Sequence, residues 1–328
     1  MGPAPVVSSR YDSAPRHPRS HAGVAGRTAR VLTTAACALA LATGALTATP
    51  APVRADDTIT TQEYFSYYKL DSTRAKGYTG KGVTIAMIDG PVDTSAPELA
   101  GANITTKTLC KYEATNATKT HATAIASVLV SKYYGLAPDA TLIAYAMPAE
   151  GEKISDECRQ DDQGLKRTSF AQFGTAMNDG AQIISYSSSD PNHEQVPLKW
   201  AIARAIAQGV IIVGPMGNDA RDENHLSLAW WSGTVGVSAV DSTGEVASYS
   251  SWGQGVVAAG VGGPIKARDY DTGTITDTRG TSISTPIVAG QIALARSRWP
   301  EATPNQILQL VTHSGLNLNN EWNQYTGY

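Results

Sequence analysis

The sequence predicts an α/β fold, a three-layer sandwich with a mostly parallel central sheet and helices on both faces. Short apolar runs bounded by turn residues, such as residues 83–88 and 141–147, have the length and composition of buried strands. Longer segments with apolar residues at helical spacing alternate with these runs, and the longest spans residues 282–298. Because parallel strands are joined through crossover helices, this alternation indicates a sheet that is covered on both faces.

The same criteria assign the remaining elements. His121 is expected at the N-terminus of an amphipathic helix over residues 121–133, which Gly135 and Pro138 end. Further strands are expected at residues 182–186, 210–213 and 234–240, and further helices at residues 169–179, 197–208 and 304–314. No repeat or low-complexity linker follows residue 56, so we expect a single domain. In such sheets the functional side chains gather at the carboxyl ends of the strands.

Charge is unevenly distributed along the 328 residues, which carry 26 Lys plus Arg against 29 Asp plus Glu. Residues 1–55 hold six Arg and one acid, so residues 56–328 carry 20 basic and 28 acidic residues, a net charge of −8. A body this acidic argues against nucleic acid or an anionic membrane surface as the main partner.

The first 55 residues have the features of a secretory signal peptide. A leader with five arginines precedes an uncharged run over residues 31–48, and Val53 and Ala55 are small residues at the −3 and −1 positions of a cleavage site before Asp56. A membrane anchor is the alternative, but threonines weaken the run and no stop-transfer charges follow it. We therefore expect a secreted, extracellular protein with no stable membrane anchor after cleavage.

Cysteine usage agrees with export. Cleavage would remove Cys37 and leave two cysteines, Cys110 and Cys158. In an oxidising compartment this even number favours a single disulfide. Two buried cysteines without a bridge are the alternative.

Three segments supply residue types that act together in hydrolysis. The first strand ends at Asp89, His121 precedes an apolar helix, and Ser282 lies where a loop turns into the longest helix. At a helix start, backbone amides and the helix dipole can stabilise an oxyanion. Each residue alone has a commoner structural role, as a turn residue, a surface or core histidine, or a helix N-cap.

Together, Asp89, His121 and Ser282 predict the acid, base and nucleophile of a catalytic triad, in the chain order of the subtilisin arrangement. No G-x-S-x-G or G-D-S-G-G segment is present, which disfavours two other classes of serine hydrolase. His193-Glu194 lacks the second histidine of the zinc-protease motif H-E-x-x-H.

Four motifs in this order resemble those of the subtilisin-like serine peptidases, the subtilase family, over roughly residues 76–328. They are the segment around Asp89 and residues 120–126, 213–219 and 280–290. The resemblance implies a subtilisin-like fold and a secreted serine endopeptidase that acts on protein or peptide substrates without a required cofactor. It also implies an oxyanion hole formed by the side chain of Asn218 and the backbone N–H of Ser282. Structural Ca²⁺ is common in the family, but no acidic cluster nominates its ligands.

By the same resemblance, two segments contact the substrate. They comprise Ser187, Ser188 and Ser189, and Gly214, Pro215, Met216 and Gly217. The chain departs from the family pattern at Gly90-Pro91 and at Ala122, where the family usually has glycine after the histidine. The methyl group of Ala122 could tilt the imidazole of His121, or a helical backbone at this position could accommodate it. None of these departures removes a reacting group.

The expected organisation is a signal peptide over residues 1–55, a short extension over residues 56–75, and a monomeric peptidase domain over residues 76–328. The final residues resemble the start of a family segment that normally continues, which favours truncation at the C-terminus. Two other function classes stay open. One is a catalytically impaired subtilase-like protein that binds peptides, and the other is a secreted esterase or acyltransferase on the same fold.

Overall fold

The structure, a computed structural model, describes residues 57–149, 151–159, 169–188, 196–222, 228–313 and 321–328. The expected signal peptide and Ser189 lie outside these residues. Within them, no helix combines the length and the apolar character that crossing a membrane requires.

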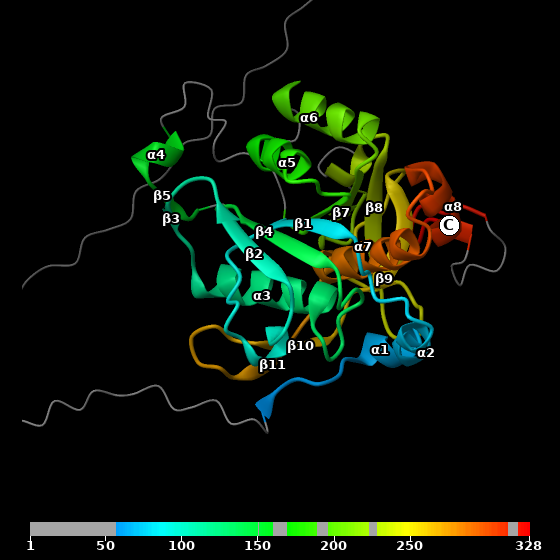
Figure 1. The fold of residues 1–328 in the computed structure, drawn as a ribbon, viewed down its shortest axis with the longest axis horizontal. Coiled ribbons are helices and arrows are strands. Elements are labelled where there is room, and N and C mark those ends of the chain that lie inside the picture. The colour runs from blue at the N-terminus through cyan, green and yellow to red at the C-terminus, as the bar shows by residue number, and fades with distance from the viewer. Residues whose placement is uncertain (1–56, 150, 160–168, 189–195, 223–227, 314–320) are drawn as a thin grey trace, which may run out of the picture. The chain divides into compact units, whose positions relative to one another are not determined.

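Seven parallel strands form the central sheet, in the spatial order β2-β4-β1-β6-β7-β8-β9 (Figure 1). These strands are β1 (Thr84–Asp89), β2 (Ile104–Thr108), β4 (Thr141–Ala146), β6 (Ile183–Tyr186), β7 (Ile211–Pro215), β8 (Thr234–Val240) and β9 (Val256–Val261). The five predicted strands correspond to β1, β4, β6, β7 and β8. Two strands were not predicted: β2, a half-exposed edge strand rich in threonine, and β9, which is rich in small residues.

Helices cover both faces of the sheet, so the predicted three-layer α/β fold is confirmed. One face packs against α3 (Asn116–Val130) and α7 (Thr281–Arg298), and the other against α5 (Ser169–Asn178) and α6 (Val196–Ala207). The remaining helices are α1 (Glu63–Tyr67), α2 (Leu70–Ala75), α4 (Asp156–Arg159) and α8 (Pro304–His313), with short 3₁₀ turns at Pro97–Leu99 and Leu228–Trp230. Two antiparallel ladders lie outside the main sheet: β3 (Tyr112–Glu113) with β5 (Lys153–Ile154), and β10 (Ile265–Arg268) with β11 (Ile275–Thr278).

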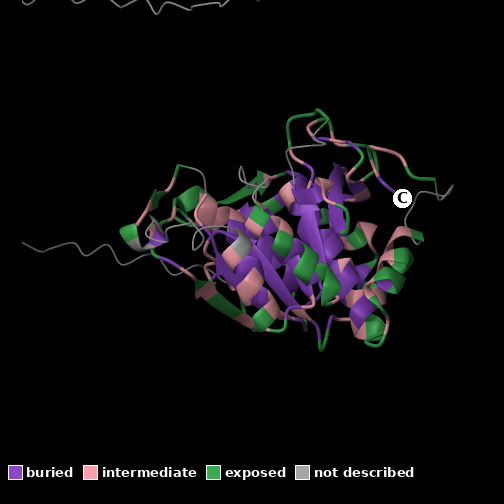
Figure 2. Cartoon of the chain, turned by 90° about the horizontal axis from the view of Figure 1, so that it is seen from above, coloured by how far each residue is buried: buried purple, intermediate pink, exposed green. Residues whose placement is uncertain are grey.

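Strand β1 contributes to both apolar cores, which Figure 2 shows as buried residues inside the outer helices. Ile85 and Met87 belong to the core that includes α3 and α7, whereas Ala86 and Ile88 belong to the core beneath α5 and α6. Because successive side chains of a strand point to opposite faces, Asp89 lies on the same face as Ile85 and Met87. The carboxylate at the end of β1 is therefore on the side of α3 and α7.

The N-terminal extension packs against the domain. Tyr64 is fully buried, and its hydroxyl donates to the carbonyl of Tyr134 at 3.3 Å. The side-chain amide of Gln62 bonds both the carbonyl and the N–H of Lys266, at 2.8 and 2.9 Å. The guanidinium of Arg74 donates to three backbone carbonyls that follow α3. These contacts join the extension to two separate parts of the domain.

Cys110 and Cys158 form a disulfide with a Cα–Cα distance of 5.2 Å across 48 residues of sequence. The bridge ties the segment before β3 to α4, and both cysteines are buried. Between the two cysteines, Tyr112 pairs with Ile154 and Glu113 pairs with Lys153. The disulfide thus closes the loop that contains the β3–β5 ladder.

We expect the double variant Cys110→Ser/Cys158→Ser, in the chain from Asp56, to melt at a lower temperature than the parent. Removing a bridge across 48 residues restores loop-closure entropy to the unfolded chain, an effect of at most about 4 kcal/mol. Calorimetry measures the change in Tm. Thiol titration of the unreduced, denatured parent is the control, and two reactive thiols per chain would contradict the bridge.

Candidate active site

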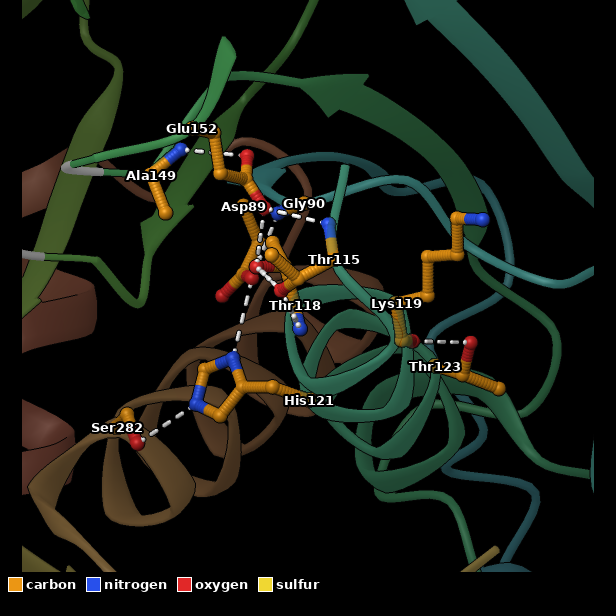
Figure 3. Close-up of polar contacts among 10 residues, drawn as sticks. All are labelled: Asp89, Gly90, Thr115, Thr118, Lys119, His121, Thr123, Ala149, Glu152 and Ser282. Atoms are coloured by element: carbon orange, nitrogen blue, oxygen red, sulfur yellow. Dashed lines mark hydrogen bonds and ion pairs between the residues drawn. The ribbon is translucent and has the colours of Figure 1, made fainter. Parts of the chain in front are cut away.

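The residues predicted as acid and base are in contact (Figure 3). Asp89 is only 4% exposed, and its Oδ1 lies 3.1 Å from His121 Nδ1. The same oxygen accepts a hydrogen bond from the N–H of Gly90 at 2.6 Å. Oδ2 is buried and has no hydrogen-bond partner in the part of the chain that the structure describes. The imidazole and the Gly90 N–H therefore compensate this buried carboxylate at Oδ1.

The pKa of His121 is raised above its ordinary value of 6.5. Burial disfavours the imidazolium and would by itself lower the pKa. The negative charge of Asp89 and its hydrogen bond to the ring act in the opposite direction, and together they outweigh burial. Asp89 thus makes His121 a stronger base and fixes the orientation of its ring.

The predicted nucleophile lies on the other side of the imidazole. His121 Nε2 is 2.9 Å from Ser282 Oγ, so carboxylate, imidazole and hydroxyl form one hydrogen-bonded chain. With its proton on Nδ1, facing Asp89, the ring has Nε2 available to accept the proton of the serine hydroxyl. Ser282 is the second residue of α7, so its backbone N–H belongs to the first turn, which lacks acceptors within the helix.

Helix α3 begins earlier than the apolar pattern predicted. It starts at Asn116, and the side chain of Thr115 caps it by accepting a hydrogen bond from the N–H of Thr118 at 3.1 Å. Residues 116–120 are polar or small and give no apolar periodicity, which is why this turn was missed. His121 lies one turn inside the helix rather than at its N-terminus, so that expectation was wrong.

Two departures from the family pattern, at Gly90 and Ala122, are compatible with the packing around α3. Gly90 lies so close to α3 that a Cβ atom on it would come within 2.8 Å of the carbonyl oxygen of Thr118. Only glycine fits there without a shift of the helix. Ala122 is fully buried in the core formed with α7, and the neighbouring His121 still reaches both Asp89 and Ser282.

Asn218, three residues beyond β7, lies beside the start of α7. Its Oδ1 accepts hydrogen bonds from the backbone N–H of Thr281 at 2.8 Å and from the Thr281 hydroxyl at 3.1 Å. Because the carbonyl oxygen is engaged, the Nδ2 donor is directed elsewhere. A Cβ atom on Gly280 would lie 3.1 Å from Ser282 Oγ and 3.4 Å from Asn218 Nδ2, so glycine keeps open the space between them. The serine motif contains Gly280 and Thr281, but no sequence pattern indicated these contacts.

The predicted substrate-contacting segments follow two central strands. After β6, Ser187 is buried and its N–H lies 3.4 Å from the carbonyl of Ile88, while Ser188 is half-buried. Gly214 and Pro215 end β7, and Gly217 donates its N–H to the Thr281 hydroxyl at 3.1 Å.

Met216 differs from its neighbours in this segment. Its side chain is fully buried in an apolar cluster with Ala229 and Val256. Any contact of this residue with a substrate would therefore involve its backbone.

No cluster of three or more His, Cys, Asp or Glu side chains that could hold a metal ion occurs among the described residues. We therefore assign no calcium ligands.

The model of the subtilase family matches residues 80–328. This chain belongs to the subtilase family. A thermostable alkaline protease of Halalkalibacterium halodurans is 29% identical to this subtilase over 257 residues, which are 77% of the chain and 67% of the relative. Subtilisin E of Bacillus subtilis is 26% identical over 267 residues, which are 78% of the chain and 66% of the relative. The chain thus spans about two thirds of the length of these relatives.

A solved structure supports the fold of this subtilase. MycP1 from Mycobacterium smegmatis superposes with a TM-score of 0.63 at 22% identity, over 81% of this chain and 82% of MycP1. The predicted family and fold are confirmed, and with them the serine-type peptidase class at the level of the family.

The raised pKa of His121 predicts the acid limb of the pH profile. The imidazole must be neutral to accept a proton, so kcat/KM falls as the pH drops through the pKa of His121, above 6.5. In Asp89→Asn we expect the midpoint to move to lower pH, because the charge that raises the pKa is gone. Activity should also fall by roughly 10³–10⁴-fold. An unchanged midpoint in pH–rate profiles of the two proteins would contradict the coupling.

Asn218→Ala removes the side-chain donor beside Ser282. We expect kcat to fall by about 10²–10³-fold with little change in KM, because the lost hydrogen bond would form only as the oxyanion develops. Steady-state kinetics on a chromogenic peptide measure both constants. The control is Asn103→Ala, an exposed amide that bonds the Thr141 hydroxyl, for which we expect wild-type kinetics.

Proposed function

We propose that this subtilase is an exported serine endopeptidase that hydrolyses peptide bonds through Asp89, His121 and Ser282. The observation that carries the proposal is the unbroken hydrogen-bonded chain from a buried carboxylate through an imidazole to a serine hydroxyl. Each residue comes from a different element, β1, α3 and α7, and all three meet on one side of the sheet at the carboxyl end of β1.

In the first half of the reaction, Ser282 Oγ attacks the scissile carbonyl carbon while His121 Nε2 takes the hydroxyl proton. Asp89 stabilises the imidazolium that forms. The imidazolium then gives its proton to the amine that leaves, and an acyl-enzyme remains. In the second half, His121 removes a proton from water as the water oxygen attacks the acyl carbon. The imidazolium then returns this proton to Ser282 Oγ as the bond to the acyl group breaks and the carboxylic acid product leaves.

The developing oxyanion needs donors that already point at it. Asn218 Nδ2 and the backbone N–H of Ser282 are proposed for this role, and the engagement of Asn218 Oδ1 by Thr281 supports it because it sets the orientation of the amide. Gly280 supports it as well, since it leaves the space between the two donors unfilled. Positioned donors of this kind stabilise the transition state without reorganisation.

The proposed substrates are proteins or peptides outside the cell. The names of the relatives, a protease and a subtilisin, support the reaction class. The signal-peptide features of residues 1–55 support export, and the disulfide between Cys110 and Cys158 agrees with an oxidising compartment.

We expect Ser282→Ala to abolish covalent labelling by a fluorophosphonate probe and cleavage of casein, with the fold unchanged. The matched control is Ser284→Ala, two residues along the same helix. Ser284 is fully buried, and its hydroxyl has no hydrogen-bond partner among the described residues. The control should label as the wild type does. Equal labelling of Ser282→Ala and wild type would contradict the assignment of the nucleophile.

The same experiment separates the two alternative functions. Labelling that depends on Ser282 without casein cleavage, but with hydrolysis of small esters, would indicate an esterase. A folded wild-type protein that binds peptides and does not label would indicate a catalytically impaired relative.

A further inference from the structure

We propose that Glu152 is a positioning residue, whose carboxylate fixes the first turn of α3 and thereby holds His121 against Asp89. The inference rests on the proposed function in one respect, since its kinetic consequence requires the triad. The effect of Glu152 on the position of the His121 imidazole does not require an active enzyme. Neither the motifs nor the spacing of the sequence pointed to this residue, which follows β4 by six positions.

Both oxygens of Glu152 are used as acceptors (Figure 3). Oε1 accepts from the backbone N–H of Thr115 at 2.8 Å and from the hydroxyl of Thr118 at 2.6 Å. Oε2 accepts from the N–H of Ala149 at 3.0 Å. Burial raises the pKa of Glu152, but these hydrogen bonds outweigh burial and lower it, so the group is ionised at neutral pH. A carboxylate at the N-terminus of α3 also interacts favourably with the helix dipole.

Thr118 links this carboxylate to the catalytic pair. It lies three residues before His121, about one helical turn away. It also lies against Gly90, where a Cβ atom would come within 2.8 Å of the Thr118 carbonyl oxygen. The N–H of Gly90 in turn donates to Asp89 Oδ1. Thr118 therefore contacts Gly90, the neighbour of Asp89, and belongs to the helical turn that leads into His121.

Contacts of the neighbouring residues hold the segment that carries Glu152. The next residue, Lys153, pairs with Glu113 in the β3–β5 ladder, and the N–H of Ser155 donates to the carbonyl of Lys111 at 3.0 Å. The Cys110–Cys158 disulfide closes the loop that contains this ladder. Glu152 therefore contacts α3 from a segment that a disulfide and backbone hydrogen bonds hold in place.

Removal of the carboxylate leaves the Thr115 N–H without its acceptor, and leaves the Thr118 hydroxyl with the Thr115 hydroxyl, 2.8 Å away, as its partner. The first turn of α3 then keeps the Thr115 cap and the contacts of Lys119 and Thr120 with Tyr270 but loses its link to the segment after β4. We therefore expect the ring of His121 to sample orientations away from Asp89 and Ser282. A displacement of about 1 Å in a reacting group can cost 10²-fold in rate. We expect Glu152→Ala to lower kcat by about tenfold or more, with KM changed by less than about twofold.

The variants Glu152→Ala, Glu152→Gln, Thr118→Val and Glu152→Ala/Thr118→Val test this assignment. Glutamine keeps one acceptor oxygen and should restore part of kcat. Valine keeps the methyl group of Thr118 and removes the hydroxyl, so the double variant should be no slower than Glu152→Ala if both residues act through one contact. The matched control is Glu113→Ala, because Glu113 lies on the same ladder in an exposed ion pair with Lys153 at 3.0 Å.

Two readouts are measured on each variant of the full mature chain. One is kcat and KM on a chromogenic peptide, with enzyme concentration set by active-site titration so that loss of folded protein does not count as loss of rate. The other is the low-field proton resonance of the His121 Nδ1–H in NMR, which reports the hydrogen bond to Asp89 without any turnover. Glu113→Ala should match the wild type in both readouts.

Unchanged kcat in Glu152→Ala, additive effects in the double variant, or an equal loss in Glu113→Ala would overturn the assignment. A wild-type protein without hydrolysis or labelling would contradict the proposed function instead. In that case the NMR resonance of the His121 Nδ1–H alone tests the positioning role of Glu152. Its broadening in Glu152→Ala and retention in Glu113→Ala support the positioning role, and an unchanged resonance in both refutes it.

Discussion

The contact between the Asp89 carboxylate and the His121 imidazole is the interaction on which the site depends. A buried charge is costly unless it is paired, and Asp89 has the N–H of Gly90 and one ring nitrogen within reach of Oδ1. The alternation of β1 sends this carboxylate to the face covered by α3 and α7. The proposed base, His121, and the proposed nucleophile, Ser282, therefore come from the two helices that pack on that face.

The position of His121 depends on the contacts that hold α3 in place. Its N-terminal turn accepts support from the Thr115 cap and from Glu152, and the carbonyls that follow its last turn accept hydrogen bonds from Arg74. Arg74 and Glu152 come from segments outside the three-layer core, the N-terminal extension and the β3–β5 region. Segments outside the layered core thus bear on the geometry of His121.

The sequence predicted what depends on local pattern and on motifs. The strands that end near Asp89 and Asn218, the long helix after Ser282, and the chain order of the triad all have strong local signals. The start of α3 was not predictable from apolar spacing, because a side-chain cap and a distant carboxylate stabilise its polar first turn. Glu152 carries no motif, and its role arises from a contact 34 residues away in the chain.

The N-terminal extension also joins parts of the chain that are far apart in sequence. Gln62 bonds Lys266, 204 residues later, and the N–H of Ile59 donates to Glu98, which pairs with Arg268. During synthesis from the N-terminus, Gln62 is made long before Lys266. Closing so long a loop ahead of the intervening structure is entropically unfavourable. We therefore expect the contacts of Gln62 with Lys266 to form late in folding, and resistance of residues 57–75 to proteolysis would mark molecules in which the extension has docked.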